Sequence, residues 1–336
     1  MPYYAAELAT GAKSFCDNPL IGSRRLNEAG LHVKRILLAE RMADARRRRL
    51  AHLVSEQDRA AYQRDGYIVT RDLLSEEALA GLRREIETTP FDAWEMHQGN
   101  AITRFIPLPP KVLKDLPYLR SAVWSDPFQK GLRYVGSTDG DPLVYLHIVI
   151  TNPDSKKRAD PQTAFHSDTF HQTAKCWFFL YDIDDAEGPF TYIPGSHRLT
   201  PERLAWEREQ SLSASTAKNR LHARGSFRLP ADQLERLNYP DPVRFAVPGN
   251  TLVVADTHGF HARATSRKPS VRVGLYGSLR RNPFLPWTGL DLFSLPGLKG
   301  RQARMYVAQK DLGKRLTGKT SHRYAGRILA TDPSPF

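Results

Sequence analysis

The chain has 336 residues, and its 49 Lys and Arg residues outnumber its 36 Asp and Glu residues to give a formal net charge of +13. Its apolar runs are no longer than a strand, which excludes an evident transmembrane helix, and its two cysteines exclude a disulfide framework and a thiolate zinc site. The first residues lack the pattern of a secretory signal, and together with the few cysteines this predicts a cytoplasmic protein. The charge excess favours an anionic partner but carries no information about the fold.

Residues 1–58 are predicted to form a basic, largely helical N-terminal extension. Nine basic residues lie between Arg24 and Leu50. Four apolar residues recur there at roughly helical spacing and predict a thin apolar stripe: Leu31, Leu38, Met42 and Ala45. A helix packed on the main domain and a helix lying on an anionic membrane surface both fit this pattern, and in the second case Arg46 to Arg49 would contact the membrane.

The main domain is predicted to span residues 59–285. A short strand at Gly66 to Val69 precedes a helix that Ser75 caps. Six later segments have the composition of strands and are separated by Gly, Pro and Asp turns: Val144–Ile150, Trp177–Ile183, Phe190–Ile193, Arg244–Val247, Thr251–Ala255 and Val271–Leu275.

Two further segments flank or interrupt these strands. A polar, partly helical insertion at about residues 199–240 is predicted to contribute to a lid over the substrate. Residues 286–336 are predicted to be a basic C-terminal tail packed on or near the core.

The sharpest local pattern is His166-Ser167-Asp168, because residues two apart in a strand present their side chains on the same side. A second histidine near this pair would complete two imidazoles and one carboxylate, the set that binds Fe(II) on one face and leaves three positions open. His258 and His261 are the candidates, and since an odd number separates them, only one would face the metal from a continuous strand. Arg272, on the next predicted strand, has the planar fork that pairs with a carboxylate.

These residues occur among motifs that together resemble the phytanoyl-CoA dioxygenase family, over about Tyr62 to Leu279. The motifs, in chain order, are Asp65-Gly66-Tyr67-Ile68-Val69, Leu73-Leu74-Ser75, His166-Ser167-Asp168, Glu187-Gly188-Pro189-Phe190, Ile193-Pro194-Gly195-Ser196-His197, Pro248-Gly249-Asn250, and His261 with Arg272.

The resemblance implies a mainly β fold with flanking helices and a double-stranded β-helix core, also called a jelly roll or cupin-like core. It implies Fe(II) bound by His166, Asp168 and His261, 2-oxoglutarate anchored by Arg272, and O₂ as the oxidant. His258 would then line the pocket or support a ligand. Trp177 is expected to border the co-substrate, although packing in the core explains it equally well.

The predicted function is hydroxylation of a small-molecule, lipid or sugar substrate, and the basic composition favours an anionic one. Arg280 and Arg281 are candidates for flanking such a substrate, although exposed surface charge is the simpler explanation. A non-catalytic jelly-roll protein that binds an anionic ligand is the main alternative. A halogenase is disfavoured by Asp168, since it needs a vacant position there, and no nucleic acid partner is expected because no recognised motif is present.

Overall fold

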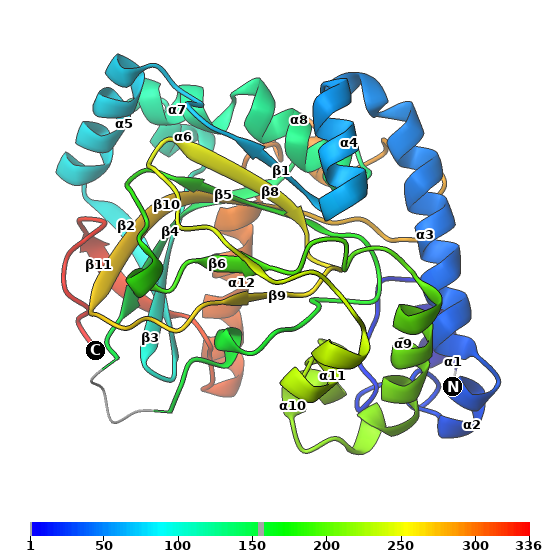
Figure 1. The fold of residues 1–336 in the computed structure, drawn as a ribbon. Helices are drawn as coiled ribbons and strands as arrows, with labels where there is room; N and C mark the ends of the chain where they lie inside the picture. Colours follow the sequence, from blue (N-terminus) through cyan, green and yellow to red (C-terminus); the bar gives the residue numbers. More distant parts are fainter. Residues whose placement is uncertain (1, 154–157) are drawn as a thin grey trace.

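The computed structural model describes residues 2–153 and 158–336, and an antiparallel sheet of eight strands lies at its centre (Figure 1). In order across the sheet, these strands are β1 (Tyr67–Thr70), β8 (Thr251–Asp256), β5 (Ala174–Phe179), β10 (Ser270–Leu279), β4 (Leu143–Thr151), β3 (Ala101–Pro107), β2 (Phe91–Gln98) and β11 (Arg323–Ile328). A smaller antiparallel sheet has the order β7 (Val243–Arg244), β6 (Phe190–Tyr192) and β9 (His261–Arg263).

Successive strands of the domain alternate between the two sheets. The chain passes from β4 in the large sheet to His166, which forms a bridge with β9 of the small sheet, and then returns to the large sheet in β5. It next forms β6 and β7 in the small sheet, β8 in the large one, β9 in the small one and β10 in the large one. This alternation is that of a double-stranded β-helix, so the predicted fold class is confirmed.

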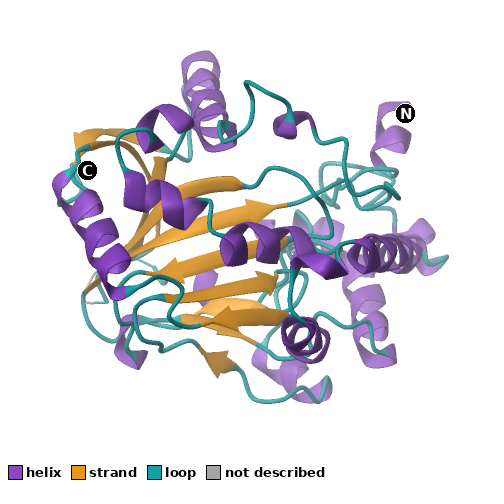
Figure 2. Cartoon of the chain, turned by 90° about the horizontal axis from the view of Figure 1, so that it is seen from above, coloured by secondary structure: helices purple, strands orange, loops and turns teal. Residues whose placement is uncertain are grey.

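The described helices surround the sheets: α1 (Pro2–Glu7), α2 (Arg24–Glu28), α3 (Leu31–Arg49), α4 (Glu56–Asp65), α5 (Glu76–Thr88), α6 (Pro110–Leu113), α7 (Pro117–Val123), α8 (Asp126–Val135), α9 (Pro201–Ser213), α10 (Arg220–Ala223), α11 (Ala231–Arg236) and α12 (Gln302–Thr317). Helices α5, α7 and α8 lie over one face of the large sheet in Figure 1, and Figure 2 shows helices crossing in front of its strands. No helix in residues 2–153 and 158–336 is long and apolar enough to cross a membrane.

The main hydrophobic core lies between the large sheet and those helices. Leu82 of α5 and Leu132 of α8 pack in one buried cluster with Leu146 of β4 and Phe178 of β5. The predicted cap of α5 is confirmed, since the Ser75 hydroxyl accepts a hydrogen bond from the Ala78 amide at 3.2 Å. A second cluster joins the two sheets, since it contains Val253 of β8, Phe190 and Tyr192 of β6, and Phe245 just after β7.

One face of the large sheet is covered by helices, and the opposite face is directed toward the small sheet. In β5, Cys176 and Phe178 belong to the helix-covered core, whereas Lys175 and Trp177 are only partly buried and line a cavity. The space between the two sheets therefore receives every second residue of β5.

The segments outside the predicted domain contact it closely, and the predicted boundaries themselves remain a prediction. The insertion forms α9, α10 and α11, whereas the strand predicted at Arg244–Val247 is limited to Val243–Arg244. Beyond residue 286, the chain forms α12 and then β11, which pairs with β2 and extends the large sheet by one strand.

The apolar stripe predicted for α3 is wrong. Leu38 is 44% exposed, and the buried face of the helix includes basic residues. Arg46 is only 2% exposed and donates to the carbonyls of Ser137 at 2.8 Å and Pro283 at 3.1 Å. The guanidinium of Arg47 lies 4.5 Å from the centre of the Tyr62 ring. Arg46 and Arg47 therefore fix α3 to the domain, and the expectation of a membrane contact is wrong for these two because their charged groups are buried. For Arg48 and Arg49, which are exposed, it stays a prediction.

Glu40, also on α3, is predicted to make stability depend on pH. Burial, followed by the nearby Asp44 carboxylate, raises the pKa of Glu40 to about 8 from an ordinary 4.5. In the unfolded chain this group loses its proton near its ordinary pKa, so stability is lost as the pH rises from the lower to the higher value. Glu40→Gln should match the wild type in acid; its advantage over the wild type should grow by at most ~1.4 kcal/mol per pH unit between the two pKa values and stay constant above them.

Thermal unfolding of both proteins across this pH range measures the effect, with the exposed Glu235→Gln as the control. A constant difference in melting temperature between wild type and Glu40→Gln at every pH would contradict the prediction.

Candidate metal centre and its cavity

His166 and His261 are held side by side by their own backbones. The His166 amide donates to the His261 carbonyl and the His261 amide donates to the His166 carbonyl, both at 3.0 Å. This pairing places the centres of the two imidazole rings 4.5 Å apart. Each Nδ1 is close to a nearby carbonyl, that of Ala164 at 2.8 Å and that of Gly259 at 3.0 Å. Because Nδ1 then carries the proton, the Nε2 lone pair of each ring is available to a metal.

Asp168 supplies the carboxylate that faces both imidazoles. Its amide donates to the Thr257 carbonyl at 2.8 Å, and its Oδ1 lies 3.9 Å from His166 Nε2 and 3.7 Å from His261 Nε2. One potential ligand atom from each of the three residues lies within 4.8 Å of the others. The structure thus brings together the three side chains that the sequence singled out.

Lys175 of β5 is a member of this site that the sequence reasoning missed. Its Nζ lies 2.5 Å from Asp168 Oδ2, whereas the distances to the two histidines are measured from Oδ1. Burial alone would raise the pKa of Asp168, but the ammonium of Lys175, followed by the interactions with the two histidines, holds that pKa well below its usual range. The carboxylate is therefore ionised, as a metal ligand must be.

His258 lies outside the cluster. Strand β8 ends at Asp256 and β9 begins at His261, so His258 is in a turn and the alternation argument used for it does not apply. Its side chain is fully buried, with Nδ1 3.0 Å from the Thr169 carbonyl.

A cavity of about 210 Å³ adjoins the histidines between the two sheets. Its lining includes His166, His261, His147, Trp177, Tyr276 and Arg272. Trp177 stacks on Phe190 with 4.0 Å between ring centres, so it both lines the cavity and packs in the core.

Arg272 presents an uncompensated positive charge to this cavity. It donates one hydrogen bond from Nη1 to the Gly188 carbonyl, while its Nε and Nη2 are buried and have no hydrogen-bond partner among the described residues. Burial, followed by the nearby Arg263, lowers the pKa of Arg272 to about 9, so it is still charged at neutral pH. Arg263 lines the same cavity but is paired with Asp160 at 2.5 Å. An anion bound in the cavity would therefore form its ion pair with Arg272 rather than with Arg263.

Comparison with known proteins gives the family. Residues 62–227 match the family model described as Phytanoyl-CoA dioxygenase (PhyH). The chain carries a phytanoyl-CoA dioxygenase family domain. With this family and this donor set, the protein is an iron- and 2-oxoglutarate-dependent enzyme. No curated protein matches the chain.

Several solved structures resemble this chain in fold at low sequence identity. The epimerase SnoN, in complex with Fe³⁺, alpha ketoglutarate and nogalamycin RO, is 16% identical with a TM-score of 0.44, over 74% of this chain and 91% of its own. HygX from Streptomyces hygroscopicus, with nickel and 2-oxoglutarate bound, is 14% identical with a TM-score of 0.41, over 67% and 86%. The carbocyclase SnoK is 18% identical with a TM-score of 0.39, over 67% and 83%.

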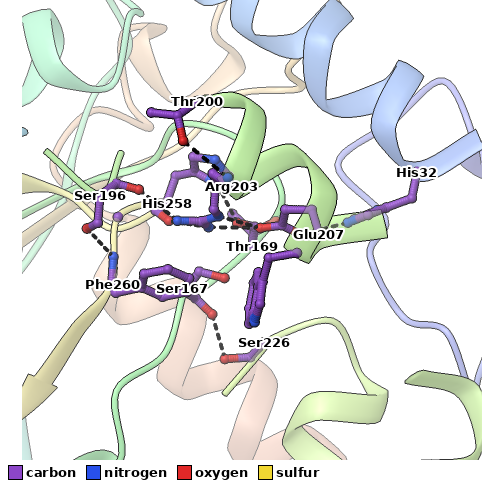
Figure 3. Close-up of polar contacts among 12 residues, drawn as sticks. His32, Ser167, Thr169, Ser196, Thr200, Arg203, Glu207, Ser226, His258 and Phe260 are labelled. Atoms are coloured by element: carbon purple, nitrogen blue, oxygen red, sulfur yellow. Dashed lines mark hydrogen bonds and ion pairs between the residues drawn. The ribbon is translucent and has the colours of Figure 1, made fainter. Parts of the chain in front are cut away.

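A buried charged network supports the turn that carries His258 and precedes His261 (Figure 3). Arg203 of α9 donates to Glu207 Oε1 at 3.0 and 2.8 Å, to the Ser196 carbonyl at 2.7 Å and to the His258 carbonyl at 3.2 Å. Glu207 Oε2 lies 2.9 Å from Nε2 of His32, on α3. The insertion and the N-terminal extension are thereby fixed to the turn that precedes His261.

Ser196 adds a second contact to this turn. Its hydroxyl accepts a hydrogen bond from the Phe260 amide at 2.8 Å, immediately before His261 (Figure 3). In the segment that carries His166 and Asp168, the Ser167 carbonyl accepts a hydrogen bond from the Ser226 hydroxyl at 2.9 Å.

Removing Arg203 should destabilise the protein strongly. Arg203 and Glu207 are 0% and 1% exposed, so Arg203→Met would leave a buried carboxylate without its main cation, at a cost of about 3–5 kcal/mol. Chemical denaturation measures the change in unfolding free energy. Arg208→Met, on the exposed face of the same helix, is the control. A loss equal in the two variants would show that the buried pair contributes nothing particular.

Proposed function

We propose that this PhyH-family enzyme hydroxylates a small molecule, with His166, Asp168 and His261 as the ligands of Fe(II) and Arg272 as the anchor of 2-oxoglutarate. The observation that carries the proposal is the unpaired Arg272 guanidinium, which lines the same cavity as the two free imidazole nitrogens. One cavity thus offers a metal-binding face and, on another wall, a cation for the far carboxylate of a dicarboxylate.

The ion fits these residues because two neutral imidazoles and one carboxylate are the donors that ferrous oxygenases use. Iron bound here with 2-oxoglutarate and O₂ supplies the oxidising chemistry, and the protein supplies position and exclusion of water. Lys175 holds Asp168 Oδ2, so only Oδ1 faces the histidines. Binding through a single carboxylate oxygen would keep more of the coordination positions open for the co-substrate and O₂.

The walls of the cavity suit an oxidation that must be protected from bulk water. Tyr145 and Tyr276 stack with 4.7 Å between ring centres, and Trp177 lies beside Tyr276. Trp177 would border 2-oxoglutarate bound along Arg272, since both residues line the cavity.

The proposal predicts that the purified chain, given Fe(II) and 2-oxoglutarate in air, slowly forms succinate. His166→Ala and Asp168→Ala should abolish this activity and lose bound iron, because each removes one of three donors. Iron content also separates the two histidines downstream: His261→Ala should lose the metal and His258→Ala should keep it.

Circular dichroism of each variant controls for folding, which matters most for the buried His258. Full succinate formation by His166→Ala or Asp168→Ala would refute the metal assignment. A chain that binds iron and 2-oxoglutarate but forms no succinate with any candidate substrate would instead favour the non-catalytic binding protein.

Arg272 should govern the affinity for 2-oxoglutarate but not for iron. Leaving a buried carboxylate without its cation costs about 3–5 kcal/mol, so Arg272→Ala should raise the apparent dissociation constant by roughly two to four orders of magnitude. Arg272→Lys keeps the charge without the fork and should give an intermediate value. The measurement is 2-oxoglutarate binding with iron content determined in parallel. Unchanged affinity in Arg272→Ala would assign the co-substrate to another cation, of which Arg263 is the nearest candidate in the same cavity.

A further inference from the structure

The N-terminal segment reaches the candidate metal centre. Lys13 donates a hydrogen bond from Nζ to the backbone carbonyl of Asp168. Gly11 and Lys13 also line a cavity of about 450 Å³, whose wall includes Asp168, Lys175 and Arg280. Neither Lys13 nor Arg280 lies in residues 62–227, the part that matches the family model.

The segment around Lys13 is fixed in place by several independent contacts. Arg35 of α3 donates from Nη2 to the carbonyls of Ala12 at 2.7 Å and Thr10 at 3.0 Å. Phe15 is 3% exposed in a cluster with Phe227 of the insertion. These contacts fix the backbone around Lys13 and so define its position at the edge of the cavity.

This cavity and the one at Arg272 are neighbours of the same third cavity. A third cavity, of about 640 Å³, shares Lys175 and Arg280 with the cavity at Lys13, and it shares Lys175, Tyr145 and Tyr276 with the cavity at Arg272. Lys175 therefore lies where all three meet, and its ammonium contacts Asp168. A molecule bound in the outer cavities would reach the metal centre at this point.

The strand β10 links the two ends of this space. Arg272 and Tyr276 are an even number of residues apart, so they lie on the same face of β10, and Arg280 follows in the same phase just after the strand ends. One face of a single strand thus carries the proposed anchor of 2-oxoglutarate, an aromatic wall and a cation at the outer cavity.

Positive charge at the outer cavity exceeds what the described residues neutralise. Lys13, Lys175 and Arg280 line it together with one carboxylate, that of Asp168, which is paired with Lys175. The Lys13 ammonium has three protons and uses one on the Asp168 carbonyl. Arg280 is exposed, as the sequence suggested, and its guanidinium has no hydrogen bond or ion pair with any described residue. Cations gathered without counter-charges at a cavity are stabilised by a bound anion.

We propose that Lys13 and Arg280 form a subsite for an oxyanion, a carboxylate or phosphate group, on the substrate of this enzyme. The N-terminal segment then completes the active site, and the group to be oxidised lies between this subsite and the metal centre, against Tyr276. The inference rests on the proposed function, because it assumes that 2-oxoglutarate occupies Arg272.

Binding of two small aromatic anions tests the subsite. The full chain is loaded with Mn(II) and 2-oxoglutarate, so that Arg272 is occupied, and is titrated by calorimetry at low salt with phenyl phosphate and with benzoate. At least one should bind, and the neutral analogue phenol should bind more weakly. Lys13→Gln and Arg280→Gln should each weaken binding about 10-fold or more, the effect of losing one charge-assisted hydrogen bond.

Two matched variants separate the subsite from general electrostatics and from misfolding. Arg41→Gln removes an exposed charge of α3 that lines none of these cavities and should leave the affinity unchanged. Lys13→Arg keeps the charge and should retain binding. Failure of both anions to bind, or equal weakening by Arg41→Gln and Lys13→Gln, would overturn the proposal.

Failure of the proposed function would be visible separately. Mn(II) and 2-oxoglutarate binding are measured in the same preparations, and if neither binds, the proposed cofactor assignment fails. The anion titrations are then repeated with Arg272→Ala, which removes the competing cation. Weakening by Lys13→Gln in that background would still support the subsite, and its absence would reject it.

Discussion

Two backbone hydrogen bonds between His166 and His261 determine the geometry of the whole site. They join segments that are far apart in the sequence and place the two imidazoles side by side. Because each ring then uses Nδ1 on a carbonyl of its own turn, both Nε2 atoms are directed to one point. Asp168 reaches the same point through its backbone bond to Thr257. The donor set is thus a consequence of strand pairing in the small sheet.

The small sheet is a weak frame for such a task by itself. Strands β6, β7 and β9 have three, two and three residues, so they contribute few ladder hydrogen bonds. The buried network around Arg203 adds hydrogen bonds to those of the short strands. Arg203 donates to the carbonyl of Ser196, which follows β6, and to the carbonyl of His258, in the turn before β9. Burying this charge costs desolvation, and the gain is a single defined position for the turn before His261.

Local patterns explain which parts of the site could be predicted from the sequence. His166 and Asp168 form a short motif, and Arg272 follows His261 by eleven residues on the next predicted strand, so residue types, spacing and the family resemblance single out all three. The argument that separated His258 from His261 assumed a continuous strand, whereas a turn lies between β8 and β9. The stripe on α3 was misjudged because arginines whose guanidinium groups meet buried carbonyls can occupy the inner face of a helix.

Residues that depend on tertiary packing could not be found in this way. Lys175 looks like an ordinary polar residue of an alternating strand, and only the fold shows that its side chain lies beside Asp168. Lys13 precedes the recognised motifs by a long stretch of chain, and nothing in its neighbourhood indicates a site. Both lysines contact Asp168, Lys175 from strand β5 and Lys13 from the N-terminal segment that precedes α2.

The elements outside the family match therefore have two roles that cannot be varied independently. Helix α3 holds Glu207 through His32 and holds the segment of Lys13 through Arg35. The first contact supports the turn before His261, and the second positions a charge at the outer cavity. A change in α3 that altered the substrate mouth would also shift the support of the metal turn. Substrate preference in this protein should thus be more easily changed at the cavity-facing side chains themselves, such as Arg280 at the end of β10, than by exchanging the whole extension.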